Sequence, residues 1–301
     1  MNAASPPTRL LSRVLTLFLR VLRHVRLLGT VDFGQILTNH TEAVLNLPGK
    51  LRFFPTNIID FSMVEALLGK LHPVASGKEL IRLGPRGDGG YLIPDDLEGI
   101  KACFSPGVSN IAGFEIDCAD RGMEVFMADG SVEMPPAFHP RFTFTQQFIG
   151  PTTRANFISL QDWVDKSLPD FGADLLLQMD IEGSEYAVLL SVPERLLRRF
   201  RIIVIEFHYL DYLFSQPIFA FYFHVFQKLL RHHTCVHIHP NNTCPPLKIG
   251  DLEIPQMAEF TFLRSDRILQ HTFARNFPHP LDCDNTARAS LALPRSLFRA
   301  T

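Results

Sequence analysis

Two almost entirely apolar runs constrain the fold of this chain more than any other feature of its sequence. The runs LLLQM (175–179) and RIIVI (201–205) each lead into acidic residues and then into a helix-like pattern. A strand that is apolar on both sides of its pleat must be buried on both faces, which is typical of parallel sheets covered by helices. These runs therefore predict an α/β fold.

The same alternation extends over most of the chain beyond residue 100. We expect strands at 101–107, 123–130, 141–150, 173–183 and 201–208, and helices at 113–122, 159–168, 184–200 and 218–233. Pro193 is expected to break the third helix. Strands alternating with helices indicate βαβ units and a mostly parallel sheet with helices on both faces. The last two strands, 234–242 and 258–264, have no helix between them, which favours an antiparallel terminal hairpin.

The ends of the chain differ from its middle. Residues 1–31 contain no acidic residue and place arginines opposite an apolar arc, so we expect a basic amphipathic helix. Its arginines are too frequent for a membrane span of about 20 residues. Peripheral membrane contact through residues 9–28, packing on the domain or a partner, and a transit peptide all stay open. We expect a helical lead-in at 32–80, the main domain at 81–270 and an irregular tail at 271–301.

Charge and cysteine content exclude several classes of protein. The formal net charge of -2 offers no global attraction for nucleic acid. The five cysteines are scattered and form no CxxC pair, which argues against a disulfide framework or a cysteine zinc site. A reducing, cytoplasmic setting is therefore expected, with membrane association through the N-terminal helix as an option.

Acidic residues end three of the expected strands. Asp129 ends one strand, Asp180 and Glu182 follow the next, and Glu206 with His208 ends a third. Ligands of open α/β sheets bind outside the carboxyl ends of the strands, so we expect these side chains to share one site. The alternative is that each carboxylate caps the helix that follows it, although Ser184 could cap its helix without Glu182.

The expected ligand is a nucleoside without a pyrophosphate. Asp129 is placed to accept two ribose hydroxyls, and Gly107 would let the backbone approach a ligand closely. The turn GVSNIAG lacks the GxGxxG pattern and has no basic residue for a pyrophosphate. S-adenosylmethionine (SAM) meets these conditions, because its sulfonium is cationic and would be favoured by acidic strand ends.

Seven stretches resemble the FkbM-type methyltransferases, which are SAM-dependent O-methyltransferases: RLGPRGDGGYLIP, FSPGVSNIAGFE, MADGSV, QMDIEGSEY, IVIEFH, HIHPNN and EFTFLR. They cover about residues 80–265, and DIEGSEY is the most specific. The resemblance implies a Rossmann-like seven-stranded methyltransferase sheet. The chain departs from the family pattern at Ser105, which replaces the usual acid, and at Ser109, which replaces the second glycine. The expected cofactor-binding residues are Gly107, Ser109, Asn110, Glu115, Asp129, Gly130, Ser131, Asp180 and Glu182, with Glu115 meeting the methionine amine.

Methyl transfer to a hydroxyl needs a group that removes its proton or a metal that lowers its pKa. The candidate catalytic residues are His208, Asp180, Glu206 and His239, with His208 as the favoured base. Strand alternation places His239 on the same face as His237, where both could instead be packed core residues. A Mg²⁺ or Mn²⁺ site made by Asp180, Glu206 and His208, or with Asn241, is left open.

The sequence therefore predicts a SAM-dependent O-methyltransferase, and the resemblance adds a sugar, glycan or other polyhydroxylated small molecule as acceptor. Two rival functions remain. One is a non-catalytic, Rossmann-like binding or scaffold protein that associates with membranes through its N-terminal helix. The other is an NAD(P)-dependent oxidoreductase, which the poor glycine pattern disfavours. Residues 88–91 are expected to form either a lid or wall of the cofactor cleft, or a plain turn that enters the sheet.

Overall fold

The structure is a computed structural model that describes residues 58–169 and 172–299. The predicted basic helix at residues 1–31, its membrane contact at 9–28 and the lead-in up to residue 57 lie outside the described residues. Within the described ranges, no helix has the length and apolar character needed to cross a bilayer.

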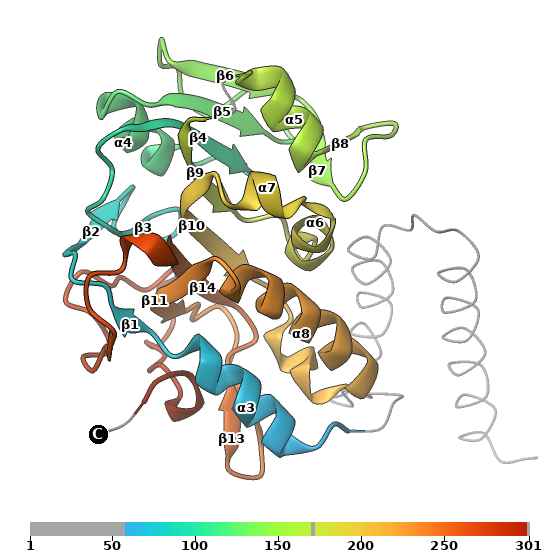
Figure 1. Ribbon diagram of the computed structural model, residues 1–301, viewed down its shortest axis with the longest axis vertical. Helices are drawn as coiled ribbons and strands as arrows, with labels where there is room; N and C mark the ends of the chain where they lie inside the picture. Colours follow the sequence, from blue (N-terminus) through green and yellow to red (C-terminus); the bar gives the residue numbers. More distant parts are fainter. Residues whose placement is uncertain (1–57, 170–171, 300–301) are drawn as a thin grey trace, which may run out of the picture.

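A seven-stranded sheet organises the molecule (Figure 1), and its strand order is β11-β14-β10-β9-β4-β5-β6. Strand β14 pairs antiparallel with both of its neighbours, whereas the remaining pairs are parallel. The mostly parallel sheet with an antiparallel terminal pair is therefore confirmed. The strands are β4 (Ile100–Pro106), β5 (Glu124–Ala128), β6 (Phe142–Thr145), β9 (Asp174–Met179), β10 (Phe200–Phe207), β11 (His233–Pro240) and β14 (Ala258–Arg264).

Four two-stranded sheets accompany the main sheet and pair β1 with β15, β2 with β3, β7 with β8, and β12 with β13. Their strands are β1 (Val74–Ala75), β2 (Leu80–Leu83), β3 (Tyr91–Pro94), β7 (Phe148–Gly150), β8 (Phe157–Ser159), β12 (Leu247–Ile249), β13 (Leu252–Ile254) and β15 (Thr272–Phe273).

The single strand predicted at 141–150 is wrong. Strand β6 pairs with β5 up to Thr145, and then the Gln147 N–H bonds back to the Thr145 carbonyl at 2.8 Å. This turn takes the chain out of the main sheet. The remaining residues form β7, which pairs with β8 instead.

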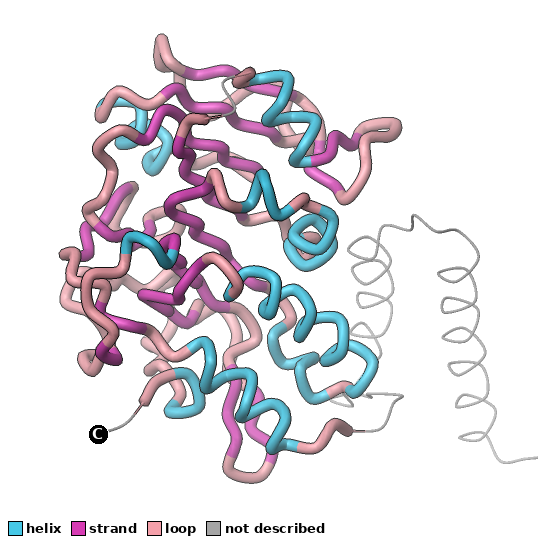
Figure 2. Tube along the Cα trace, viewed as in Figure 1, coloured by secondary structure: helices cyan, strands magenta, loops and turns pink. Residues whose placement is uncertain are grey.

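Helices cover both faces of the main sheet (Figure 2), as predicted. Residues of α3, α5, α6, α7 and α8 pack in one apolar cluster, and residues of α4 pack with the β2–β3 hairpin in another. The helices are α3 (Phe61–Leu71), α4 (Gly113–Asp120), α5 (Leu160–Ser167), α6 (Glu185–Ser191), α7 (Glu194–Leu197) and α8 (Gln216–Leu230), with short 3₁₀ turns η1 (Leu210–Phe214), η2 (Ser265–Arg267) and η3 (Arg295–Leu297).

Strand alternation explains how one apolar run serves two cores. In β9, Leu175 and Leu177 join the larger cluster, and Leu176 joins the cluster beneath α4. Each fully buried leucine contributes roughly 1.5–3 kcal/mol of hydrophobic stabilisation. The helix that follows β9 breaks where expected, since α6 ends before Pro193 and α7 begins after it.

The strand order reverses beside β4, and this decides where a ligand can bind. From β4 the chain adds β5 and β6 on one side, and it adds β9 and β10 on the other. The loops after β4 and β9 therefore diverge and leave a crevice at the carboxyl edge of the sheet. All of the acidic strand ends predicted from the sequence lie at this edge.

The C-terminal segment packs on the same edge. Asn285 donates to Glu259 of β14 at 2.7 Å, and Asn242 donates to the carbonyl of Thr286 at 3.1 Å. Asp282 pairs with His237 of β11 at 2.8 Å. The segment beyond β15 is irregular but well anchored. The predicted domain bounds at residues 81 and 270 stay predictions.

Candidate active site

A cavity of about 440 Å³ opens at the crevice between β4, β5 and β9. This volume lies in the range of small-molecule sites, roughly 300–1,000 Å³. Eight of the predicted site residues line it: Gly107, Ser109, Asn110, Glu115, Asp129, Ser131, Asp180 and Glu182. An apolar wall that the sequence analysis missed comes from Phe148, Ile149 and Phe157 of β7 and β8.

Gly107 is required at the cavity because the backbone of Asp180 packs directly against it. Its φ angle of +87° is in the left-handed region, and a Cβ atom there would lie 1.6 Å from the carbonyl oxygen of Asp180. The turn after β4 therefore rests directly against the end of β9. The space beside Gly107 that the sequence analysis assigned to a ligand is therefore occupied by the backbone of Asp180.

Three non-glycine residues with left-handed backbones follow β4, β9 and β10. They are Ser109 (φ +45°), Glu182 (φ +55°) and Tyr209 (φ +57°). Such conformations cost of order 1–3 kcal/mol each and persist where surrounding structure holds them, often at functional sites. Their position after three strands of one sheet edge supports the assignment of this edge as the site.

Asp129 is held firmly at the end of β5. Its Oδ2 accepts from the Ser109 N–H at 2.9 Å, and its Oδ1 accepts from the Ser131 N–H at 2.7 Å and hydroxyl at 2.6 Å. A carboxylate offers about four acceptor positions, so one remains for a ligand. A second becomes free if the Ser131 hydroxyl rotates. Gly130 is not among the cavity-lining residues, and a Cβ atom there would meet the Phe148 ring at 2.5 Å.

A buried chain of polar groups begins at Glu115. The Ser105 hydroxyl lies 2.5 Å from Glu115 Oε1 and 2.7 Å from Gln178 Oε1, and the Gln178 amide donates to the Tyr91 hydroxyl at 3.2 Å. A hydroxyl has one proton and cannot donate to both acceptors. A protonated Glu115 resolves the conflict by donating to Ser105. Burial supports this assignment, because it raises the pKa of the Glu115 carboxyl to about 7.

Replacing Glu115 with glutamine is expected to raise stability at pH 8 by up to about 3 kcal/mol. The carboxyl has a pKa of about 7 in the folded chain against an ordinary value of 4.5. Between these values the folded state keeps a proton that the unfolded state releases, so stability falls as the pH rises through this window and then levels off. Urea unfolding of both proteins from pH 4.5 to 8 measures the difference. Equal pH profiles would show that Glu115 is ionised, and the exposed Glu133→Gln is the control.

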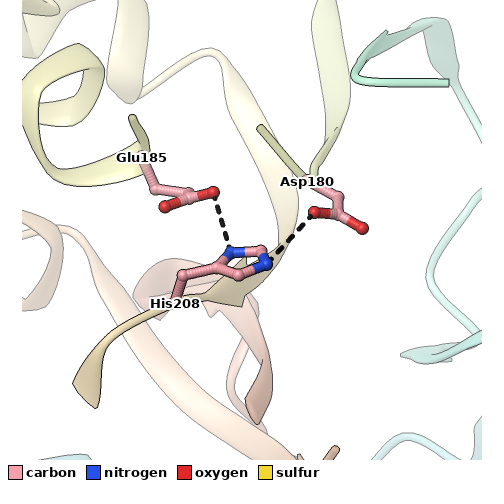
Figure 3. A group of neighbouring side chains, drawn as sticks. All are labelled: Asp180, Glu185 and His208. Carbon is pink, nitrogen blue, oxygen red and sulfur yellow. Dashed lines mark hydrogen bonds and ion pairs between the residues drawn. The ribbon is translucent and has the colours of Figure 1, made fainter. Parts of the chain in front are cut away.

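His208 stands at the centre of a group of carboxylates (Figure 3). Its Nδ1 lies 3.2 Å from Glu185 Oε1, on the opposite side of the ring from Asp180. Its Nε2 lies 3.9 Å from Asp180, 3.5 Å from Glu182 and 3.8 Å from Glu206. The structure therefore brings three of the four predicted catalytic residues together, and it adds Glu185, which the sequence analysis did not select.

The electrostatics of this group change the role expected for His208. Burial alone would lower the pKa of its imidazole, but the ion pairs with Glu185, Asp180 and Glu206 outweigh burial and raise the pKa to about 10. An imidazolium cannot accept a proton from a substrate. Burial and the neighbouring Glu206 carboxylate raise the pKa of Asp180 well above its ordinary range. Asp180 lines the cavity and is the better-placed base.

Besides Gly130 and His208, two further predicted residues are not among the residues that line the cavity. Glu206 is buried and accepts a hydrogen bond from the Asn241 amide at 2.9 Å. His239 belongs to a separate polar cluster, where it lies 3.6 Å from Asp282 and opposite Glu259 in the strand register. The structure does not bring His239 to the cavity.

The loop at residues 88–91 lines the cavity through Asp88, Gly89 and Tyr91, so it forms part of the wall. Arg82 holds this loop in place by donating to the carbonyls of Pro85 at 2.8 Å and Gly87 at 2.7 Å. The Arg82 guanidinium therefore stabilises the conformation of this loop.

Comparison with known proteins identifies the class of this site. Residues 127–235 match the family model described as the methyltransferase FkbM domain. This segment is similar to an FkbM methyltransferase domain. The matched segment of this methyltransferase contains Asp129, Asp180, Glu185 and His208, whereas the turn after β4 precedes it. No curated protein sequence matches the chain.

Three solved structures show weak likeness to this methyltransferase. One is a putative methyltransferase from an antibiotic biosynthesis pathway of Anabaena variabilis (11% identity, 61% of this chain and 67% of that chain, TM-score 0.26). Another is magnesium protoporphyrin IX methyltransferase (ChlM) from Synechocystis with bound SAM (14%, 88% and 100%, TM-score 0.28). The third is EvdMO1 (11%, 68% and 47%, TM-score 0.26).

Proposed function

We propose that this methyltransferase uses SAM to methylate a hydroxyl of an uncharged, polyhydroxylated acceptor such as a sugar. The observation that carries the proposal is the cavity at the reversal of strand order, with Asp129 at one strand end and Asp180 at another. An FkbM-type domain supports the methyl transfer, and the sugar class of acceptor comes from the family resemblance alone.

The cavity suits the parts of SAM one by one. Asp129 offers an acceptor to the ribose hydroxyls, and the wall of Phe148, Ile149 and Phe157 offers apolar surface to the adenine. Glu115 lies deeper and can meet the amine of the methionine group. No lysine or arginine occurs among the described residues that line the cavity, which favours a cationic ligand over the pyrophosphate of NAD.

Bound SAM supplies the methyl group, and the protein must position an acceptor hydroxyl in line with it. The acceptor oxygen forms the new bond to carbon while the carbon–sulfur bond breaks, and the hydroxyl proton passes to Asp180. Burial and the neighbouring Glu206 carboxylate raise the pKa of Asp180, so its carboxylate is a stronger base than that of an ordinary aspartate. Asp88, Asp180 and Glu182 all line the cavity, so an anionic acceptor would be repelled.

Calorimetry with SAM, its demethylated product and NAD tests the proposal. We expect SAM and the product to bind and NAD not to bind. Asp129→Asn should weaken SAM binding by roughly 1.5–3 kcal/mol, the typical contribution of a hydrogen bond to a charged group. The exposed Glu133→Gln, a few residues along the chain, should not alter affinity. Binding of NAD alone, or an unaltered affinity in Asp129→Asn, would refute this assignment.

The remaining sequence-based expectations stay predictions. They are peripheral membrane contact through residues 9–28, the absence of nucleic-acid binding and a cytoplasmic location.

A further inference from the structure

We propose that Glu185 and His208 form a buried ion pair that positions the base, Asp180, with His208 acting as a fixed cation. Neither Glu185 nor His208 is among the residues that line the cavity, so both act through Asp180 rather than on the substrate. Their effect on catalysis rests on the proposed methyl transfer. The ion pair itself does not.

Glu185 ties the turn after β9 to the end of β10. Its side chain is fully buried, and its Oε1 accepts from the backbone N–H groups of Ile181 at 3.1 Å and Gly183 at 3.0 Å. The same oxygen lies 3.2 Å from Nδ1 of His208, which directly follows β10. The turn that these contacts close contains Glu182 in its left-handed conformation. The carboxylate of Glu185 therefore fixes both the turn and the imidazole ring.

The buried carboxylate of Glu185 requires a cation. Its Oε2 has no hydrogen-bond partner, so a proton on this oxygen would have no acceptor, and we assign the carboxylate as ionised. Burying an ionised carboxylate without a compensating cation is costly. In the part of the chain that the structure describes, Glu185 forms an ion pair with His208 and with no lysine or arginine. A charged imidazolium would balance this carboxylate.

The contacts on the other side of the ring call for a second ring proton. Nε2 lies 3.9 Å from Asp180, 3.5 Å from Glu182 and 3.8 Å from Glu206. Because Nδ1 donates its proton to Glu185, a neutral ring would turn the lone pair of Nε2 toward these carboxylates, and the contacts would be repulsive. A proton on Nε2 makes every one of them attractive. The raised pKa of His208, about 10, agrees with this assignment.

The fixed cation acts on Asp180 in two ways. Oδ1 of Asp180 is buried without a hydrogen-bond partner, and Nε2 of His208 is the cation that faces it (Figure 3). This attraction holds one carboxylate oxygen toward the ring and leaves the other on the side away from it. The positive charge also favours the ionised carboxylate, which is the form that can take a proton from an acceptor hydroxyl.

The ion pair competes with the Mg²⁺ or Mn²⁺ site that the sequence leaves open. Asp180, Glu185 and His208 form a group whose ligand atoms lie within 4.8 Å of one another. The two carboxylates lie on opposite sides of the ring (Figure 3), however, and an imidazolium has no lone pair with which to bind an ion. We therefore assign the imidazolium itself as the positive charge of this group.

Nitrogen NMR of the isotope-labelled full chain tests the ion pair without any substrate. The ring signals of His208 are those that disappear in His208→Gln. We expect both ring nitrogens to stay protonated from about pH 5 to about pH 9, although an ordinary imidazole loses its proton near pH 6.5. Glu185→Gln keeps an oxygen for the backbone N–H groups of the turn but removes the charge. It should weaken proton binding by His208 at least about tenfold, which is one pKa unit.

Glu194→Gln is the matched control. Glu194 is the first residue of α7, as Glu185 is of α6, and it also pairs with a histidine, since Nε2 of His232 lies 3.4 Å from it. The substitution should leave the signals of His208 unchanged. A neutral His208 ring at pH 8 in the wild type would overturn the ion pair even if Glu185→Gln fails to fold. Equal titration of His208 in the wild type and Glu185→Gln, or broadening of its signals by one equivalent of Mn²⁺, would overturn it too.

The pH dependence of turnover tests the effect on Asp180. Turnover should fall as the pH decreases, because a protonated Asp180 cannot accept the hydroxyl proton. Removing the cation in His208→Gln favours the protonated carboxyl, so the fall should begin at a higher pH. On the falling limb, turnover should be at least about tenfold lower than in the wild type, which corresponds to one pKa unit, and the loss should shrink as the pH rises. The other titratable groups that face Asp180 are unchanged in this variant: Tyr91, Glu182, Glu185 and Glu206.

A purely structural role would give a different result. If His208→Gln lowered turnover by the same factor at every pH, the effect on Asp180 would be refuted. A wild type that holds His208 protonated but binds no SAM would instead refute the proposed function and leave the ion pair standing.

Discussion

Replacing Asp180 with asparagine is expected to reduce the turnover number for methyl transfer by at least about a hundredfold, the lower end of what a general base contributes. The variant keeps the size and hydrogen-bonding capacity of the side chain and removes its ability to take a proton. SAM affinity should change little, since Asp129 and the apolar wall are untouched. Steady-state kinetics with a labelled methyl donor, together with calorimetry for SAM, measure the two effects separately.

Glu182→Gln is the comparison for this experiment. Glu182 lines the same cavity and lies 3.5 Å from His208, but its side chain is 84% exposed. Solvent can replace much of what an exposed carboxylate contributes, so its loss should lower turnover less than about tenfold. A larger loss of turnover in Glu182→Gln than in Asp180→Asn would show that Asp180 is not the base.

Replacing Gly107 with alanine is expected to destabilise the fold by at least about 3 kcal/mol. An L-residue in the left-handed region costs roughly 1–2 kcal/mol, and the new Cβ would also displace the backbone of Asp180, which lies 1.6 Å away. Because that displacement separates the turn after β4 from the end of β9, SAM binding should fall as well. Denaturant unfolding and calorimetry measure both effects.

The variant Gly122→Ala separates the cost of the left-handed backbone from the cost of the clash with Asp180. Gly122 has a similar φ angle of +91°, but a Cβ atom there would meet nothing within 4 Å. Gly122→Ala should therefore cost only the roughly 1–2 kcal/mol of the left-handed backbone. Equal destabilisation by the two substitutions would mean that the turn after β4 can move away from β9 without strain.

Much of the fold could be predicted because it depends on local patterns. The runs at 175–179 and 201–205 are apolar at every position except Gln178 and Arg201, and such runs become β9 and β10 in the centre of the sheet. Pro193 removes a backbone donor and separates α6 from α7. The prediction failed at 141–150, because the choice between pairing with β5 and pairing with β8 depends on partners distant in sequence.

The candidate site was predicted in part. Asp129 and Asp180 end parallel strands, so their meeting at one edge follows from the strand pattern. Glu185 had no such signal, since an acid in the first turn of a helix ordinarily complements the helix dipole. The surroundings of His239 could not be predicted either. Strand alternation predicts the face of the sheet on which a side chain lies, but it does not predict which loop packs on that face. Asp282, 45 residues beyond His237, comes from that loop.

The sequence by itself determined the α/β class, the parallel core and the edge at which the acidic strand ends gather, because burial and strand polarity act residue by residue along the chain. Tertiary structure alone decided which carboxylates surround His208 and on which side of its ring each one lies. The tertiary structure also decided that Gly107 packs against the end of β9. These outcomes depend on distances between segments that are far apart in sequence, and no local pattern encodes such distances.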